Sequence, residues 1–391
     1  MNHPSPHMNG YLVAKLFECN CIKQGNFRLK SGEISKYYYD MKNLISHPLL
    51  LSTIGDEIYK RLPPFDIICG IPYGGLPIAC YISTRYNKPM IFLRNEIKSY
   101  GTQRLIEGEF KPTDRCVIID DVVTSGKSLL DAYNILHQQV KVVDVFTILH
   151  RQNPILVFNK KINSLLYKND VTKYFLTRII EHKKSKICFS ADLTDPNKIL
   201  ELLEKIGKYI VVCKIHHDII QHDRYTGELY GVSFKEALIV LSIKHKFLIM
   251  EDRKFSDISS IVRQQYSKFA NWVDLVTVHS NTSNETIQSL SGAMIIANMS
   301  NNTYDNTAQA MLMANLNNTN VVGFISQKRL DPNFITMTPG ISTEIKQIKD
   351  QRYRHYTKVD TDVLIIGRAL YTSNDIEKTA KTIKDNLLYK R

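Results

Sequence analysis

The sequence contains the stretch Ile118-Ile119-Asp120-Asp121-Val122-Val123-Thr124-Ser125-Gly126, in which an apolar run stops at two carboxylates and a loop of small residues. A run rich in Ile and Val is typical of a buried strand, and the residues after Gly126 indicate the start of a helix. Backbone N–H groups at a helix N-terminus bind phosphate, and paired carboxylates accept hydrogen bonds from adjacent sugar hydroxyls. The stretch therefore predicts a strand, loop and helix that together hold a sugar phosphate.

A second charged stretch, Glu251-Asp252-Arg253-Lys254-Phe255-Ser256-Asp257, follows an apolar run in the other half of the chain. On a β-strand, residues two apart share a face, so we expect Asp252 and Lys254 to project to one side and Arg253 to point away. Lys214, at the end of the preceding predicted strand, supplies another cation. If these ends converge, Lys214, Asp252, Lys254 and Asp257 form an alternating ionic cluster that keeps Asp252 charged. A structural salt-bridge network is the alternative.

Short β-rich apolar runs recur in the C-terminal half, with helix-like segments between most of them. The runs are 187–192, 209–216, 247–254, 274–280, 293–300, 321–326, 334–340 and 363–370. Alternating strand and helix signals imply a parallel sheet, and eight such units close a (β/α)8 barrel whose strand ends converge on one rim. We expect the last helix at 373–388.

The N-terminal half has fewer units, and their pattern predicts an open α/β sheet with its ligand beyond the carboxyl ends of the strands. Candidate strands lie near 26–30, 36–41, 66–71, 89–94, 116–121 and 142–148, and helices near 46–60, 75–86 and 126–139. Residues 150–172 lose periodicity without becoming a Gly/Ser-rich linker. We place the two domains at residues 1–168 and 169–391.

The amino-acid composition limits the kinds of binding partner that the protein is expected to have. There are 51 Lys and Arg against 38 Asp and Glu, a net charge of +13, which suits anionic partners or a solvated basic surface. No arginine-rich arm occurs, so nucleic-acid binding is not expected. Seven cysteines, of which only Cys19 and Cys21 are close in sequence, favour a reducing compartment over a disulfide framework or a zinc site. Without a signal pattern or a spanning apolar run, we expect a soluble cytoplasmic protein with no membrane partner.

The N-terminal half resembles an orotate phosphoribosyltransferase over roughly residues 11–150. The resemblance is carried by Leu29-Lys30-Ser31-Gly32, Tyr37-Tyr38-Tyr39-Asp40, Gly70-Ile71-Pro72-Tyr73-Gly74-Gly75-Leu76-Pro77, Arg94-Asn95-Glu96-Ile97-Lys98-Ser99-Tyr100-Gly101 and the Asp120–Gly126 stretch. It implies an enzyme that joins orotate to phosphoribosyl pyrophosphate, with Mg²⁺, and releases pyrophosphate.

The same resemblance implies roles for individual residues. Orotate would lie against Lys30, Tyr38 and Tyr39, and a mobile loop with the catalytic Lys98 would close over pyrophosphate. Arg94 and Arg104 belong to the pyrophosphate side with Lys98, and Tyr100 is a further residue of the site for phosphoribosyl pyrophosphate and orotate. The ribose phosphate would be held by Asp120, Asp121, Thr124, Ser125, Gly126, Lys127 and Ser128, with the two aspartates also assisting the metal, directly or through water. Asn95 departs from the family, which commonly has a second lysine there, so pyrophosphate affinity is expected to be weaker.

The C-terminal half resembles orotidine 5′-monophosphate decarboxylase over about residues 172–391, and the barrel is that family's fold. Matching segments are Ser190-Ala191-Asp192, Lys214-Ile215-His216-His217-Asp218, Glu251–Ile258, Trp272-Val273-Asp274-Leu275-Val276-Thr277, Met299-Ser300, Thr338-Pro339-Gly340, Gln351-Arg352-Tyr353 and Ile366-Gly367-Arg368. The resemblance implies decarboxylation without a cofactor. Asp252 would repel the substrate carboxylate, and Lys254 would stabilise and protonate the carbon that CO₂ leaves.

The remaining positions complete an orotidylate site. Lys214 and Asp192 would fix the ribose hydroxyls, Ser300 would read the pyrimidine edge, and Asp257 in relatives reaches a neighbouring subunit's site, which implies a homodimer. The other binding residues are His216 and Pro339, with Gln351, Gly367 and Arg368 for the phosphate, since loops after barrel strands seven and eight commonly bind phosphate. Three departures from the family are Asn298 in place of a glutamate, and Ile215 and Ile261 in place of threonines.

Together the two resemblances imply a bifunctional enzyme of the uridine monophosphate synthase type, which makes orotidine 5′-monophosphate and then UMP. Two alternatives stay open. The first domain could act on a purine or on free uracil, or the chain could be a nucleotide-binding regulator, or a monofunctional enzyme, with one or both sites inactive, as Asn95 and Ile261 would allow.

Overall fold

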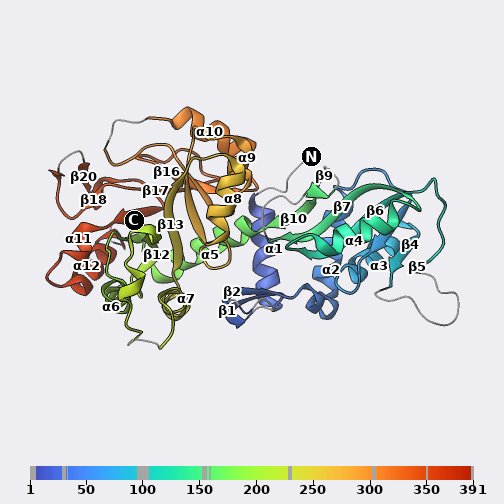
Figure 1. Cartoon of the computed structure of the whole chain (residues 1–391), viewed down its shortest axis with the longest axis horizontal. Coiled ribbons are helices and arrows are strands. Elements are labelled where there is room, and N and C mark those ends of the chain that lie inside the picture. Colours follow the sequence, from blue (N-terminus) through green and yellow to red (C-terminus); the bar gives the residue numbers. More distant parts are fainter. Residues whose placement is uncertain are drawn as a thin grey trace. The chain divides into compact units, whose positions relative to one another are not determined.

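The computed structural model describes residues 6–28, 32, 34–94, 105–151, 156–157, 160–227, 231–301, 305–348 and 351–388 (Figure 1). The chain divides into two compact units, one formed by residues 1–23 and 38–171 and the other by residues 24–37 and 172–391. The expected boundary between residues 168 and 169 lies in the first turn of helix α5 (Lys168–Lys183). The expected division differs from these units in two respects, because the first unit extends to residue 171 and residues 24–37 group with the second unit.

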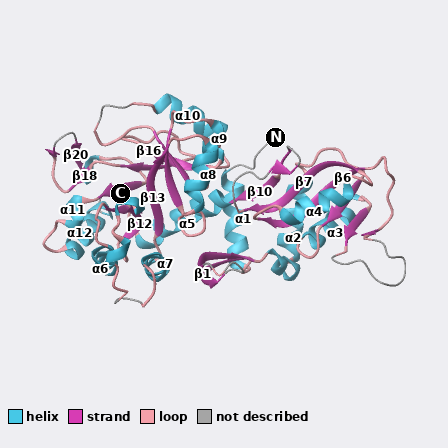
Figure 2. Cartoon of the chain, viewed as in Figure 1, coloured by secondary structure: helices cyan, strands magenta, loops and turns pink. Residues whose placement is uncertain are grey.

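The first unit is built on an open six-stranded sheet in the order β10-β7-β6-β3-β4-β5, which confirms the predicted architecture. Strands β10, β7 and β6 of this sheet are labelled in Figure 2. Neighbouring strands are parallel except β4 and β5, which are antiparallel. The strands are β3 (Ile67–Gly70), β4 (Met90–Leu93), β5 (Ile106–Glu107), β6 (Arg115–Val123), β7 (Lys141–His150) and β10 (Asn163–Tyr167). The helices are α1 (Pro6–Glu18), η1 (Met41–Ser46), α2 (Pro48–Tyr59), α3 (Gly75–Tyr86) and α4 (Lys127–Leu136).

The segment that we expected to lack regular structure contains strands. Residues of β10 pair in parallel with β7 at the edge of the sheet, and β8 (Leu156–Val157) pairs with β9 (Lys160–Lys161). Strand β10 is only five residues long and begins with Asn163-Ser164, so no periodic pattern distinguishes it from a loop. It is held by the pairing with β7 and by burial of Leu165 and Leu166.

The second unit is a closed barrel of eight parallel strands, as predicted. Its strands are β11 (Ile187–Ala191), β12 (Ile210–Ile215), β13 (Leu248–Phe255), β14 (Leu275–His279), β15 (Ala293–Ile296), β16 (Val321–Ile325), β17 (Ile335–Thr338) and β21 (Val363–Ile366). Each overlaps one of the expected runs. A small sheet of β18 (Ile341–Ser342), β20 (Gln351–His355) and β19 (Lys346–Ile348) follows β17.

Helices alternate with the barrel strands. They are α5, α6 (Pro196–Ile206), η2 (His217–Ile219), η3 (His222–Arg224), α7 (Phe234–His245), α8 (Ser259–Ser267), α9 (Asn284–Gln288), α10 (Thr307–Leu316), η4 (Tyr356–Lys358), α11 (Arg368–Tyr371) and α12 (Ile376–Leu388). Helix α6 begins where the Asp195 carboxylate accepts hydrogen bonds from the N–H groups of Asn197 and Lys198. Most of the expected strands are longer than the observed ones. The difference is largest where Ser300 lies beyond β15 and where Arg368 opens helix α11.

A hairpin from the beginning of the chain completes the second unit. It pairs β1 (Ile22–Arg28) with β2 (Ile34–Tyr39). The Nζ of Lys36 lies 2.6 Å from Oδ2 of Asp274, and the two side chains are 2% and 3% exposed. Asp274 directly precedes β14 and also accepts a hydrogen bond from the N–H of Ile249. Lys36 is thus the counterion of a carboxylate inside the barrel unit.

We expect Lys36→Met to destabilise the barrel unit by about 3 kcal/mol or more, because it leaves Asp274 buried and unpaired. Lys36→Met combined with Asp274→Asn should recover most of this loss, since an amide oxygen can still accept from Ile249. Urea unfolding of the full chain followed by tryptophan fluorescence measures it, because the chain has one Trp, Trp272, buried in this unit. Lys198→Met, at an exposed pair, is the matched control. Equal unfolding midpoints for Lys36→Met and Lys198→Met would contradict the assignment.

Candidate functional site

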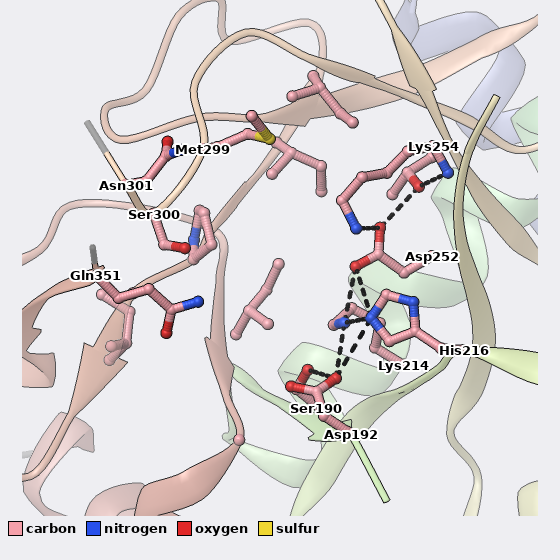
Figure 3. A pocket seen from close by; sticks show the side chains of 18 of the residues that line it. Ser190, Asp192, Lys214, His216, Asp252, Lys254, Met299, Ser300, Asn301 and Gln351 are labelled. Carbon is pink, nitrogen blue, oxygen red and sulfur yellow. Dashed lines mark hydrogen bonds and ion pairs between the residues drawn. The ribbon is translucent and has the colours of Figure 1, made fainter. Parts of the chain in front are cut away.

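Three charged side chains meet at the carboxyl ends of two neighbouring barrel strands (Figure 3). Lys214 of β12 places Nζ 2.7 Å from Oδ2 of Asp252, and Lys254 places Nζ 3.0 Å from Oδ1 of the same carboxylate. Both Asp252 and Lys254 belong to β13. On the other side, Nζ of Lys214 lies 3.1 Å from Oδ1 of Asp192, which follows β11. The structure therefore brings together Lys214, Asp252 and Lys254 as the sequence predicted.

The local geometry of Lys254 differs from a regular strand. Its φ is +54°, in the left-handed region, and the pairing of β13 with β14 shifts register between Glu251 and Phe255. Asp252 and Lys254 nevertheless meet on one side and Arg253 pairs elsewhere, with Asp218, as the alternation of a strand predicts. Lys254 reaches Asp252 by way of a local bulge, which re-aims a side chain at the strand end.

Burial and ion pairing oppose each other in this cluster. Burial alone would raise the pKa of Asp252, but the charges of Lys214 and Lys254 outweigh it and hold that pKa well below its usual range. Burial would likewise lower the pKa of Lys214, yet Asp252 and Asp192 raise it. Burial, aided by the Lys214 charge, lowers the pKa of His216. Nζ of Lys214 lies 3.0 Å from Nε2 of His216, and an ammonium can only donate, so His216 is neutral with Nε2 as the acceptor.

The cluster forms one wall of a cavity of about 310 Å³. Every predicted orotidylate-binding residue lines this cavity, namely Asp192, His216, Ser300, Pro339, Gln351, Gly367 and Arg368. Figure 3 shows Ser300 and Gln351 across the cavity from Asp252 and Lys254. The lining also includes residues that the sequence reasoning did not assign to the site, among them Ser190, Thr277, Ile296, Met299, Ile325, Tyr353 and Ile365. These residues are uncharged. Ser190, Thr277, Met299 and Tyr353 lie in segments that match the decarboxylase family, but their residue types do not by themselves indicate a role in the site.

Asp257 does not join the cluster within one chain. It is exposed, lies beyond the end of β13 and is absent from the cavity wall. Its Oδ1 accepts a hydrogen bond from the N–H of Ile258, and its carbonyl accepts one from the hydroxyl of Thr286. The expectation that four side chains meet in one volume is therefore wrong for the single chain, because the backbone has already turned toward α8 at this residue.

The departures from the family pattern lie outside the ionic cluster. Ile215 is fully buried in the hydrophobic core, and Ile261 is 36% exposed. The side-chain oxygen of Asn298 accepts from the Ser326 hydroxyl, and its amide nitrogen donates to Asp305. Within the described residues, none of the three lines the cavity.

The first unit presents its own pair of carboxylates near the end of β6. Asp120 is 7% exposed and its Oδ1 accepts a hydrogen bond from the N–H of Asp121. Burial, reinforced by the neighbouring Asp121 carboxylate, raises the pKa of Asp120. A Cβ on Gly74 would lie 2.0 Å from Oδ2 of Asp121, so only glycine allows this approach of the 70–77 loop to the carboxylate.

The loop after β6 leads into helix α4 as expected. Gly126 has φ +75° and directly precedes the helix. As a glycine it has no side chain to cap the helix N-terminus with a hydrogen bond. Thr124, Ser125, Lys127 and Ser128 surround this helix start, and Ser125, Lys127 and Ser128 are exposed. The arrangement leaves backbone N–H groups at the helix N-terminus for an anion.

The structure describes only some of the other residues that were predicted for the first site. Arg94 is ion-paired with Glu107, and the guanidinium of Arg151 lies 4.9 Å from the ring centre of Tyr39. Tyr38 is 42% exposed. Lys30, Lys98, Tyr100 and Arg104 lie outside the described residues.

Lys42 is a candidate residue of the first site that was not predicted from the sequence. Its Nζ lies 3.0 Å from Asp40, and that contact, with attraction from Asp121, raises the pKa of Lys42. The feature of the sequence that could have indicated Lys42 is its position two residues after the segment Tyr37-Tyr38-Tyr39-Asp40.

The structure also bears on metals, membranes and redox state. In the ranges that the structure describes, no group of three or more His, Cys, Asp or Glu side chains could hold a metal ion. No described helix combines the length and hydrophobicity of a bilayer span. All seven cysteines are free thiols.

The fold and the rim cluster define a (β/α)8-barrel enzyme joined to a second α/β unit with a sugar-phosphate type of loop. The chain belongs to the orotidine 5′-phosphate decarboxylase / HUMPS family, whose model matches residues 185–383. It is 29% identical to the uridine 5′-monophosphate synthase of Bos taurus, over 95% of each chain. It is also 34% identical to the orotate phosphoribosyltransferase of Chlamydia pneumoniae, over 52% of this chain and 98% of the relative.

Among solved structures, the chain is similar to the orotidine 5′-monophosphate decarboxylase of Methanocaldococcus jannaschii complexed with the inhibitor BMP. The identity is 17% and the TM-score 0.41, with 52% of this chain and 98% of that chain covered.

Glu251, next to Asp252, is a buried carboxyl outside the cavity. It is 0% exposed; its Oε2 accepts a hydrogen bond from the N–H of His217, and its Oε1 has no hydrogen-bond partner among the described residues. Burial raises the pKa of Glu251 to about 8.

The free energy of unfolding should therefore fall between about pH 5 and pH 8, because the unfolded chain loses the Glu251 proton while the folded chain keeps it. The slope from this group is at most about 1.4 kcal/mol per pH unit. Glu251→Gln should flatten the fall relative to wild type and to Glu285→Gln, an exposed control. Urea unfolding followed by Trp272 fluorescence across this range measures it, and parallel curves for all three proteins would contradict the assignment.

Proposed function

We propose that this chain catalyses two consecutive reactions of pyrimidine nucleotide synthesis. The first joins orotate to phosphoribosyl pyrophosphate, giving orotidine 5′-monophosphate and pyrophosphate, and the second decarboxylates that nucleotide to UMP. The observation that carries the proposal is the similarity, over 95% of the chain, to a uridine 5′-monophosphate synthase. The ionic cluster in the barrel cavity supports the second reaction. No comparison favours an inactive regulator or another base as substrate.

The decarboxylase role of Asp252 follows from its surroundings. Decarboxylation at pyrimidine C6 breaks a C–C bond whose electron pair has no carbonyl or cofactor to enter, so electrostatics must lower the barrier. The Asp252 carboxylate is 11% exposed and fixed between two ammonium groups, and it borders the cavity. A substrate carboxylate beside it would be repelled in the ground state, and the repulsion would vanish as neutral CO₂ leaves.

Exposure and partners distinguish the two lysines. The Lys214 side chain is 7% exposed and held by Asp192 and Asp252, whereas the Lys254 side chain is 37% exposed and paired with Asp252 alone. Lys254 is therefore the better placed proton donor. In the proposed step the C6–carboxylate bond breaks, CO₂ departs, the electron pair stays on C6 and takes a proton from the Lys254 ammonium, and water later reprotonates the amine.

The rest of the cavity suits the remaining parts of the nucleotide. Gln351, Gly367 and Arg368 lie where barrel enzymes commonly bind phosphate, and Arg368 supplies a planar cationic fork. Asp192 and Lys214 would hold the ribose hydroxyls, with His216 as a neutral neighbour. Ser300 and Pro339 face the space for the base.

In the first unit, Asp120 and Asp121 would hold the ribose hydroxyls of phosphoribosyl pyrophosphate, and the start of α4 its 5-phosphate. Lys98 would act from the loop that closes over pyrophosphate. Two neighbouring carboxylates fit a Mg²⁺ ion that arrives on a polyphosphate, because Mg²⁺ is usually bound by one or two carboxylates together with substrate phosphates. When bound, the ion would neutralise charge on the leaving pyrophosphate.

A homodimer would complete the second site. Asp257 and Ile258 are exposed beside the cavity-bearing strand, which leaves both free to meet another subunit. We propose that Asp257 enters the partner's cluster as the fourth charge. We place the enzyme in the cytoplasm, where a reducing environment would keep its seven free thiols intact.

Incubation of the protein with orotate, phosphoribosyl pyrophosphate and Mg²⁺ should yield UMP, with orotidine 5′-monophosphate as a transient. Lys254→Ala should lower the second rate by at least about 10³-fold and let the intermediate accumulate, because the proton donor is lost. Asp121→Asn or chelation of Mg²⁺ should slow only the first reaction. Chromatographic separation of the two nucleotides measures both rates.

Arg253→Ala is the matched control for this assay, because Arg253 lies between Asp252 and Lys254 but pairs weakly with Asp218 outside the cavity. It should leave both rates nearly unchanged. Conversion of the intermediate by Lys254→Ala at the wild-type rate would refute the proposed role.

Mixing two inactive variants tests the shared site. Lys254→Ala and Asp257→Ala should each lack decarboxylase activity, and refolding an equal mixture should restore about a quarter of the wild-type activity, since half the dimers are mixed and each contains one intact site. The decarboxylase assay before and after mixing measures it. Full activity of Asp257→Ala alone, or no recovery on mixing, would show that the site lies within one chain.

A further inference from the structure

The backbone of Lys254 is held in a conformation that its side chain disfavours. With φ at +54°, a lysine stands in the left-handed region, and such a residue persists at a site only when its surroundings hold it there. The hydrogen-bonding pattern of β13 with β14 is interrupted at this position, between Glu251 and Phe255. Something other than the regular strand ladder must therefore fix the Lys254 backbone.

The hydroxyl of Thr277 on β14 fills that gap. Its Oγ1 accepts a hydrogen bond from the N–H of Lys254 at 2.9 Å and donates one to Oδ1 of Asp252 at 2.8 Å. The direction of both bonds is determined, because an amide N–H can only donate and an ionised carboxylate can only accept. Thr277 is 1% exposed and lines the cavity, so water does not compete for these bonds.

One hydroxyl thus links the two charged residues of the cluster by different atoms. It holds the main chain of Lys254 and the side chain of Asp252, and the Lys254 ammonium then meets the same Oδ1 that Thr277 contacts. Lys214 takes the other oxygen, Oδ2. Without the hydroxyl, Asp252 loses the partner that sets the rotation of its carboxylate, and Lys254 loses the bond that stabilises its left-handed backbone.

We propose that Thr277 is a positioning residue for decarboxylation, which aligns Asp252 and Lys254 through this single hydroxyl. The inference rests on the proposed function of the barrel site and goes beyond it. Thr277 carries no charge and need not touch the reacting atoms, so its role is to position Asp252 and Lys254. Displacement of a reacting group by about 1 Å can cost on the order of 100-fold in rate. The effect should therefore fall on kcat more than on KM.

The test compares Thr277→Val, which keeps the shape and removes the hydroxyl, with Thr277→Ser, which keeps the hydroxyl. In the full chain, Thr277→Val should lower kcat for orotidine 5′-monophosphate by about 10- to 100-fold with less than about a threefold change in KM. Thr277→Ser should retain most of the wild-type kcat. Neither should alter the phosphoribosyltransferase rate.

Thr338→Val is the matched control. Thr338 is a buried threonine of β17, and its hydroxyl has no hydrogen-bond partner within the described residues. Thr338→Val should keep the wild-type kcat. This control separates the effect of removing any buried hydroxyl from the effect of removing the Thr277 hydroxyl. Trp272 fluorescence checks that each variant is folded, and Thr277→Ala replaces Thr277→Val in the comparison with Thr277→Ser if the valine variant does not fold.

The outcomes separate this inference from the proposed function. A wild-type protein without decarboxylase activity refutes the proposed function. If the wild type is active and Thr277→Val is equally active, the proposed role of the Thr277 hydroxyl is wrong, while the proposed function stands. The same follows if Thr338→Val or Thr277→Ser loses as much kcat as Thr277→Val.

Discussion

The buried carboxylate of Asp252 is the constraint around which the barrel rim is arranged. A buried charge is tolerated only when it is paired and hydrogen-bonded, and this carboxylate, at 11% exposure, is bound by two ammonium groups and one hydroxyl. Those partners come from β12, β13 and β14, so three neighbouring strands must end at the correct height for the charge to be stable. The same contacts that satisfy the carboxylate also aim it into the cavity, so stability and chemistry depend on one geometry.

A second buried ion pair acts at the base of a strand of the same barrel unit. Asp274 precedes β14, and its counterion, Lys36, belongs to residues 24–37 near the start of the chain. Thr277, three residues further along, links Lys254 to Asp252. One short strand therefore has a charge pair at its beginning and a hydrogen-bonded link to the ionic cluster near its end. The pair explains why the early hairpin groups with the barrel, although its sequence neighbours belong to the first unit.

Much of the fold could be predicted because its signals are local. Most barrel strands are short runs of buried, mainly apolar residues, and all six residues of β12 are buried, with Lys214 as its one charged side chain. The ionic cluster was found because charged residues directly after such runs are conspicuous. Strand β10 was missed because its first residues are polar and its pairing with β7 is not local. The bulge at Lys254 was missed because alternation assumes a regular strand, and no residue type marks a left-handed lysine. Asp257 stays out of the cluster of its own chain because the backbone turns toward α8 there, which sequence spacing does not show.

The sequence by itself determined the alternation of strands and helices, the number of barrel units and the identity of the charged residues at strand ends, because these depend on burial patterns along a short stretch. The tertiary structure alone decided which lysine is buried and which remains accessible, that Thr277 joins two charges, and that Lys36 neutralises Asp274. Those properties depend on distances between residues far apart in the chain, and the electrostatic energy of a charge depends on its neighbours in space and not on its neighbours in sequence.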